Sequence, residues 1–207
     1  MPKQEVPLNN LAHYLPSNCL SEVLYYLEKY KIHLTITRKR QTILGDYRHP
    51  HQNKTHRISV NGNLNKYSFL ITLLHELAHL LTFEQYGNRI SPHGTEWKKE
   101  FGEILYKFIV KKIFPKPIEE VLQKTLKNPA ASSCGDENLL RILRMYDPKK
   151  EGVFLIEQIK EESIFSIKGG RSFIKGPKIR TRYKCKEIST NKLYLFSGLY
   201  EVTLISN

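Results

Sequence analysis

The pattern of apolar and polar positions divides the 207-residue chain into a helical part and a strand-rich part. Apolar residues recur with helical spacing over 17–30, and the stretch 65–87 is apolar on almost every side. Alternating or β-branched runs at 32–37, 42–47 and 56–60 predict strands between these two helices. A second long helix is expected from Ser91-Pro92, a cap residue followed by proline, to about Ile113. The pattern therefore predicts helices packed on a small antiparallel sheet.

The pattern changes after Pro115 and Pro117 end the second long helix. Short helices are expected over 118–127 and 137–146, followed by a turn or linker from Asp147 to Gly152. Six short strand-like runs follow, at 153–159, 163–167, 171–175, 180–188, 192–196 and 199–205. We therefore expect an α+β fold with a first domain over 1–147 and a small all-β module over 152–207.

The buried helix carries the candidate chemistry in His75-Glu76-Leu77-Ala78-His79. Residues four apart lie on one face of a helix, so both imidazoles can reach a single ion. Glu76 follows the first ligand, where its carboxylate can hold and deprotonate a water at the open position of the metal. Two histidines and a glutamate inside an apolar helix are costly without partners, and a metal ion would be a partner for all three. We therefore predict one Zn²⁺ ion held by His75 and His79, with Glu76 as the catalytic acid/base.

A third ligand must come from elsewhere in the chain. The extended motif with a glycine and a third histidine fails, because Thr82 and Gln85 occupy those positions. His93 is favoured, since a short loop between antiparallel helices can return it to the metal. The carboxylates that could replace it are Glu96, Glu100 and Glu103.

Taken together, His75-Glu76-x-x-His79 and the later His93-Gly94-x-x-Trp97-Lys98 resemble the SprT-like metalloprotease domain. This family includes bacterial SprT proteins and the animal protein Spartan, and the resemblance covers roughly residues 15–115. It implies a zincin-like core in which His75, His79 and His93 bind zinc and Glu76 is catalytic. It also implies substrates that are bound or crosslinked to DNA.

The cysteines mark a departure from this family. Many SprT proteins continue into a zinc ribbon built on two cysteine pairs, but Cys19, Cys134 and Cys185 are isolated here. The usual ribbon is therefore missing, and the β module is expected in its place. All three cysteines are expected to be packing residues in a reducing compartment.

Two further expectations concern the predicted sheet. A strand edge beside the metal can accept a peptide as an extra strand, and 56–60 is the candidate because it directly precedes the motif helix. His49, His51 and His56 lack the spacing of metal ligands and are expected to be solvated.

The charge of the chain points to a polyanionic partner. The net charge is +13, and eight cations with no acidic residue lie between Ser163 and Lys186. Within this segment Arg180, Arg182, Lys184 and Lys186 alternate, so one strand would present all four on one face, where a phosphate backbone could neutralise them. Phe173 and Tyr183 could stack on bases if exposed, and the Arg38-Lys39-Arg40 run could extend the surface.

The predicted function is a zinc-dependent metallopeptidase that acts on DNA-associated or DNA-crosslinked proteins. Its expected partners are a protein or peptide substrate and DNA or another nucleic acid. The alternative is a nucleic-acid-binding stress or transcription-associated protein whose zinc site is structural, against which Glu76 argues. The amino terminus lacks the apolar run of a signal peptide, and no stretch is predicted to span a membrane. We therefore expect a cytoplasmic, bacterial-type protein that could associate with the nucleoid.

Overall fold

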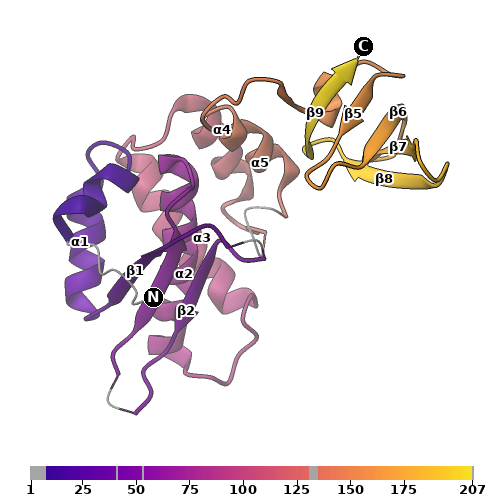
Figure 1. The fold of residues 1–207 in the computed structure, drawn as a ribbon. Coiled ribbons are helices and arrows are strands. Elements are labelled where there is room, and N and C mark those ends of the chain that lie inside the picture. Colours follow the sequence, from indigo (N-terminus) through magenta and orange to yellow (C-terminus); the bar gives the residue numbers. More distant parts are fainter. Residues whose placement is uncertain (1–7, 41, 53, 131–134, 207) are drawn as a thin grey trace. The chain divides into compact units, whose positions relative to one another are not determined.

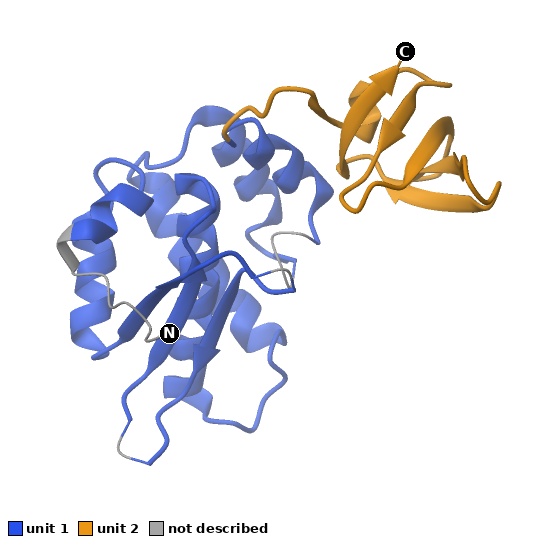
Figure 2. Cartoon of the chain, in the orientation of Figure 1, with its two compact units in different colours: residues 1–147 blue, residues 148–207 orange. Residues whose placement is uncertain are grey.

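A computed structural model describes residues 8–206 apart from 41, 53 and 131–134, and its ribbon is drawn in Figure 1. It is a mixed α+β structure made of two compact units, residues 1–147 and 148–207 (Figure 2). The first unit contains a 3-10 helix at Leu8–Tyr14, helices α1 (Leu20–Lys29), α2 (Lys66–Tyr86), α3 (Thr95–Val110), α4 (Lys116–Thr125) and α5 (Glu137–Arg144), and strands β1 (His33–Thr37), β2 (Gly45–Arg48) and β3 (Arg57–Asn61).

Helix α2 forms the centre of the first unit. The Asn65 side chain caps its start by accepting hydrogen bonds from the backbone N–H groups of Tyr67 and Ser68, and Gly87 ends it with a φ of 66°. Its apolar side chains face the core on nearly every side, as the sequence predicted for residues 65–87. The helix that carries the predicted ligands is therefore held rigidly.

The sheet of the first unit differs from the prediction in its pairing. The strand order is β1-β3-β2, and β3 is antiparallel to β2 but parallel to β1. The expectation of an antiparallel sheet is therefore wrong for β1. Since β1 and β2 run in opposite directions on either side of β3, the middle strand can be antiparallel to only one of them. The expectation that the 56–60 strand forms an edge is also wrong, because β3 is central and β2 is the edge in contact with α2.

Helix α3 begins later than predicted. Gly94 is its N-cap, with its carbonyl accepting from the N–H of Lys98, and the preceding turn is closed by the N–H of Gly94 on the carbonyl of Ser91. Ser91-Pro92 is therefore not the helix start, and His93 lies in the turn that leads into α3. Helix α3 packs against α2, which brings this turn back toward the motif histidines.

The second unit is a six-stranded sheet in which all neighbouring strands are antiparallel. Its strand order is β4-β9-β5-β6-β7-β8. The bounds are β4 (Val153–Leu155), β5 (Ile164–Ser166), β6 (Ser172–Ile179), β7 (Arg182–Glu187), β8 (Leu193–Ser197) and β9 (Glu201–Ser206), with a 3-10 turn at Ile156–Gln158. Phe165, Phe173 and Cys185 belong to a core of its own. Each of the six predicted strand-like runs overlaps one of these strands, although β6, β8 and β9 extend beyond the predicted ends.

Two remaining expectations concern cysteines and the membrane. Cys19 and Cys185 are free and buried, as a packing role requires, whereas Cys134 lies outside the described residues. Among the residues described, no helix combines the length and apolar character that crossing a membrane requires.

Candidate metal centre

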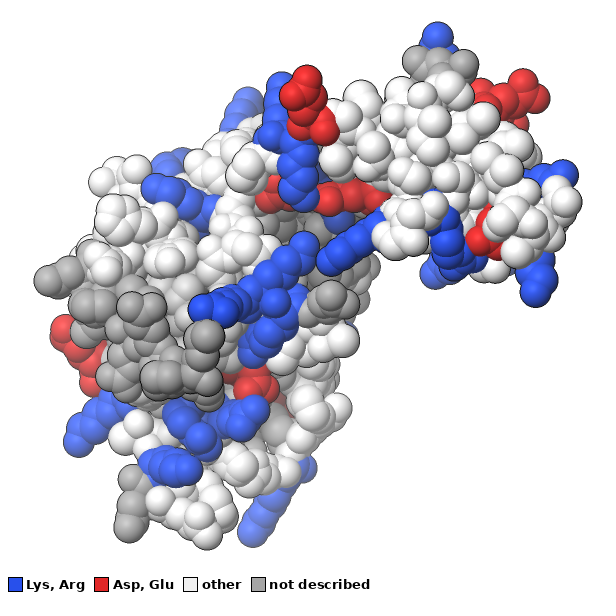
Figure 3. Space-filling view, viewed as in Figure 1, with Lys and Arg blue, Asp and Glu red and all other residues white. Residues whose placement is uncertain are grey.

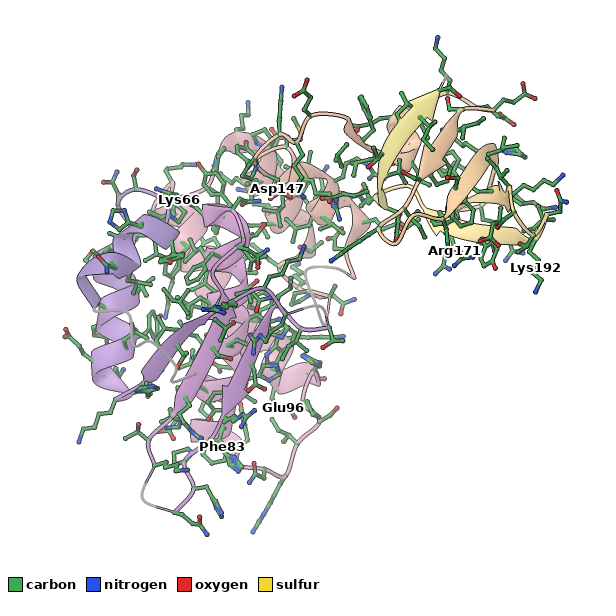
Figure 4. The ribbon with its side chains drawn as sticks, viewed as in Figure 1. Lys66, Phe83, Glu96, Asp147, Arg171 and Lys192 are labelled. Atoms are coloured by element: carbon green, nitrogen blue, oxygen red, sulfur yellow. The ribbon has the colours of Figure 1, made fainter. Side chains whose placement is uncertain are left out.

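The three predicted histidine ligands converge in the first unit. Nε2 of His75 lies 3.2 Å from Nε2 of His79 and 3.3 Å from Nε2 of His93. His75 and His79 stand one turn apart on α2, and His93 reaches them from the turn before α3. Figure 4 labels Phe83, one turn after His79, and Glu96, in the first turn of α3, on the same side of this unit. Helix spacing and the α2–α3 packing together make the cluster.

These distances fit a tetrahedral zinc ion. Two nitrogens bound to zinc at about 2.0–2.1 Å are about 3.3 Å apart when the geometry is tetrahedral. The candidate ligand atoms of the three histidines all lie within 4.8 Å of one another, and among the described residues these are the ones that form such a group. The donor set is therefore suited to one metal ion with a fourth position left over.

Burial keeps these imidazoles neutral, which is the form that binds a metal. Burial and the neighbouring His79 and His93 lower the pKa of His75 to about 3. Burial and His93 lower the pKa of His79 to about 4, and burial lowers that of His93. The nitrogen lone pairs are thus available at neutral pH.

Glu76 lies beside the cluster in a confined position. Its side chain is buried, and its carboxylate accepts a hydrogen bond from the backbone N–H of Tyr47 in β2. Burial, followed by the charge of Asp46, raises its pKa to about 8, against the opposing effects of Arg40 and the Tyr47 N–H. Glu76 and His75 line the same pocket, so the carboxylate and a metal ligand face one space.

The rival carboxylate ligands do not join the cluster. Glu100 is buried, and burial raises its pKa, but it lies outside the group formed by the three histidines among the described residues. Glu103 pairs with Lys99 at 4.0 Å on the exposed side of α3, and Glu96 is in its first turn. The geometry therefore favours His93 over Glu96, Glu100 and Glu103.

Tyr47 and His56 form a support beside His79 that the sequence did not predict. The Tyr47 ring is parallel to that of His79, with centroids 6.5 Å apart, and its hydroxyl lies 3.0 Å from Nδ1 of His56. Nε2 of His56 is 3.3 Å from Oε1 of Glu84. His56 is 7% exposed, so its expected solvation is wrong. His51 is exposed, and His49 is half-buried with its ring centroid 5.0 Å from that of Phe83.

Trp97 packs against the rings of all three histidines. Its ring centroid is 4.7 Å from that of His75, 5.4 Å from that of His79 and 4.7 Å from that of His93. Its side chain is fully buried, and Nε1 has no hydrogen-bond partner among the described residues. The histidine rings are therefore held by aromatic packing as well as by the two helices.

Gly45 is a second site residue that sequence reasoning passed over. A Cβ atom built there would lie 2.5 Å from Oε1 of Glu76, so the strand can approach the carboxylate only because the side chain is absent. A glycine inside a strand pattern is a signal for such a close approach, and Gly45 in the 42–47 run offered it.

The predicted basic surface is only partly as expected. Arg182 and Lys186 are exposed on β7 and Lys184 is half-buried, while Cys185 faces the core. Arg180 lies in the turn before β7 with a φ of 54°, so it does not share the strand face. Lys and Arg side chains are spread over the visible surface of both units (Figure 3), so positive charge is not confined to this strand.

The proposed stacking residues and the second basic run also differ from expectation. Phe173 is fully buried in the core of the second unit and cannot stack on a base. Tyr183 is half-buried, with Nζ of Lys175 4.4 Å from its ring centroid. Arg40 is bound to the first sheet, with its guanidinium donating to Asn61 and Ser59, whereas Arg38 and Lys39 are exposed.

The arrangement of these residues is typical of the metal sites of metalloproteases. It consists of two histidines one helical turn apart, a third histidine from a neighbouring turn and an adjacent glutamate.

Comparison with known proteins agrees: residues 17–113 match the SprT-like family. Over 31 residues the chain is 55% identical to protein SprT of Glaesserella parasuis serovar 5 (strain SH0165), a segment that is 15% of this chain and 19% of that protein. The chain therefore spans about a fifth of the length of that relative. No solved structure matches this chain. The chain carries a SprT-like, metalloprotease-like domain at residues 17–113.

Proposed function

We propose that the protein is a zinc-dependent metallopeptidase with a zincin-like core. The observation that carries this proposal is the convergence of three neutral imidazole nitrogens at 3.2 and 3.3 Å, beside a buried glutamate that lines the same pocket as His75. A purely structural site has no use for a carboxylate in that place. Bound zinc would supply a Lewis acid that activates water and polarises a peptide carbonyl.

The proton chemistry belongs to Glu76. Its carboxylate, oriented by the Tyr47 N–H, can hold the attacking water, accept its proton and pass that proton to the leaving amine. A bound cation favours the charged carboxylate, which opposes the rise in pKa that burial causes. The edge of β2 lies next to Glu76, and we propose this edge, in place of β3, as the one that receives an extended substrate.

The test compares zinc content with peptide cleavage in the full chain. Glu76→Gln is expected to keep one zinc per chain, measured by elemental analysis, and to lose cleavage of an unfolded protein by about 100- to 10,000-fold. Glu103→Gln, an exposed carboxylate on α3, is the matched control and should retain activity. Wild-type protein that holds zinc and cuts nothing would support the alternative, a structural zinc site in a nucleic-acid-binding protein.

We also propose that the second unit holds the enzyme on nucleic acid, so that DNA-bound or DNA-crosslinked proteins are its substrates. The alternation of Arg182, Lys184 and Lys186 on one strand supports this, since like charges repel and phosphates relieve the repulsion. On the neighbouring strand β8, the residues paired with Lys184 and Lys186 are Leu195 and Leu193. Both leucines are exposed, and neither is aromatic. Binding is therefore expected through phosphates and without preference for base sequence.

DNA binding is tested by fluorescence anisotropy at several salt concentrations. Combined replacement of Arg182, Lys184 and Lys186 by alanine should weaken binding and lower the magnitude of the slope of log K against log salt by about 2–3. The control removes three exposed cations of the same unit, Lys149, Lys160 and Lys168, with an identical change in net charge. Equal effects in both variants would contradict a defined site on β7.

A further inference from the structure

A small apolar cavity opens beside the candidate catalytic residues. Its volume is about 250 Å³, and His75 and Glu76 form part of its wall. The remaining wall comes from four helices, from the segment that leads into β2, and from Pro129, Ala130 and Asp136 between α4 and α5. Its apolar side chains include Ile71 on α2, Phe101 and Leu105 on α3, Leu122 on α4 and Leu139 on α5.

Besides His75 and Glu76, the wall has four polar side chains, Thr42, Thr72, Thr125 and Asp136, and the last three of these are already engaged. The hydroxyl of Thr72 donates to the carbonyl of Ser68 at 2.8 Å, and that of Thr125 to the carbonyl of Leu122 at 3.2 Å. Asp136 accepts hydrogen bonds from the backbone N–H groups at the start of α5. Away from Glu76 and His75, the cavity therefore presents a mostly apolar surface to an occupant.

The size of the cavity restricts what can fill it. Whole small-molecule ligands usually occupy pockets of about 300–1,000 Å³. A cavity of about 250 Å³ falls below this range and has room for one large side chain. Because Glu76 and His75 line it, its occupant must lie next to the reacting bond.

We propose that this cavity binds an apolar side chain, of the size of leucine or phenylalanine, from a residue that flanks the peptide bond to be cut. The proposal rests on the proposed peptidase function and adds a substrate preference to it. Burial of such a side chain predicts a preference over alanine of about 10- to 100-fold in kcat/KM.

The part of the wall that α4 and α5 form makes the expected side-chain preference a property of this chain. Leu122 and Leu139 lie beyond residue 113, where the match to the SprT-like family ends. Helices α4 and α5 pack on each other, and α4 also packs on α3. The family match alone therefore does not predict this pocket.

The test uses the full chain with zinc and a peptide series that differs at one residue. Cleavage sites in an unfolded protein are first mapped by mass spectrometry, and we expect leucine, methionine or phenylalanine to be enriched at one position flanking the cut. Peptides with Leu, Phe, Ala or Asp at that position are then compared by kcat/KM. Their affinity for Glu76→Gln, measured by anisotropy, gives a readout that does not need catalysis.

Two variants of α4 locate the preference in the cavity. Thr125→Phe places a ring in the pocket and should reduce the preference for leucine over alanine to less than about 3-fold, on the same burial argument. Gln123→Phe adds the same ring to an exposed position of the same helix and should leave the preference intact. Zinc content and melting temperature show whether each variant is folded.

The outcomes separate this proposal from the proposed function. Cleavage without any side-chain preference, or a preference that both α4 variants retain, overturns the pocket and leaves the peptidase standing. Tight binding of the Leu peptide to the wild type and to Glu76→Gln, with cleavage by neither, overturns the peptidase and supports the pocket. Equal affinity for all four peptides overturns the pocket independently of activity.

Discussion

Gly45 and Glu76 are in closer contact than any other residue at position 45 would allow. A Cβ atom at position 45 would lie 2.5 Å from Oε1 of Glu76 and 2.8 Å from Cγ2 of Thr72. Neither distance is compatible with unperturbed packing. The carboxylate would have to move, because the strand that carries Gly45 is fixed by its pairing with β3.

Gly45→Ala is therefore expected to lower kcat by about 10- to 100-fold, since a displacement of about 1 Å in a catalytic group can cost that much. Zinc content should be unchanged, because the atoms nearest to a Cβ at this position belong to Glu76 and Thr72 and not to the histidines. Steady-state kinetics with elemental analysis will distinguish the two effects. A variant with the kcat of the wild type would show that the position of Glu76 is not set by Gly45.

A pH dependence follows from the buried imidazoles of the zinc-free protein. Burial lowers the pKa values of His75, His79, His93 and His56, so the folded state binds fewer protons than the unfolded state, in which histidine titrates near about 6.5. Their contribution is present above that pH and is lost as the pH falls. Glu76, with its pKa raised to about 8, acts in the opposite direction but accounts for one proton.

The free energy of unfolding of the zinc-free protein is therefore expected to fall by on the order of 1–3 kcal/mol between pH 7 and pH 5. Urea unfolding at several pH values measures it. Stability that is constant or higher at pH 5 would contradict the burial of these histidines. Added zinc should make the loss at low pH steeper, because protons then compete with the metal.

At the scale of elements, α3 and α4 meet at a backbone contact. A Cβ atom at Gly102 of α3 would lie 2.4 Å from the carbonyl oxygen of Leu126, at the end of α4. This close approach holds α4 where Leu122 and Thr125 line the apolar cavity.

Gly102→Ala tests that contact against helix propensity. Propensity alone would stabilise the protein by about 1 kcal/mol, whereas the clash is expected to give a net loss of about 1–2 kcal/mol. Denaturant unfolding measures the sign, with Glu103→Ala at the adjacent exposed position as the control. A more stable Gly102→Ala protein would show that α4 can shift without cost.

The position of elements was more predictable than their pairing. Asn65 and Gly87 marked the ends of α2, and turn residues separated the six strands of the second unit, because caps and alternation are local signals. The parallel pairing of β1 with β3 depends on the position that β2 takes in the sheet. Short stretches of sequence do not determine that position. The burial of Phe173 and His56 likewise depends on neighbours that only the fold supplies.

The convergence of the candidate metal ligands was predictable only in part from local signals. His75 and His79 are related by helix geometry alone, while the choice of His93 over three carboxylates required the packing of α3 on α2. The support from Tyr47 and the close approach of Gly45 come from a strand edge, whose position beside α2 could not be obtained from spacing.

At the scale of the whole molecule, the two units have separate hydrophobic cores. One core surrounds α2 in residues 1–147, and the other lies within the sheet of residues 148–207. The candidate metal ligands all belong to the first.

Zinc should therefore stabilise only one of two unfolding transitions. Calorimetry of the full chain with zinc at about 100 times its Kd should show one transition stabilised by about 2.7 kcal/mol relative to the chelated protein. The other transition should not move. A shift of both transitions by equal amounts would mean that the two cores unfold together.

Trp97, the only tryptophan of the chain, contacts the rings of all three histidines. The tryptophan fluorescence of the unlabelled protein therefore originates beside the candidate metal centre, with no second indole to obscure it. We expect a paramagnetic substitute such as Co²⁺ to quench this emission as it binds. The arrival and departure of the ion can then be timed by stopped-flow mixing, on the intact chain and under turnover conditions.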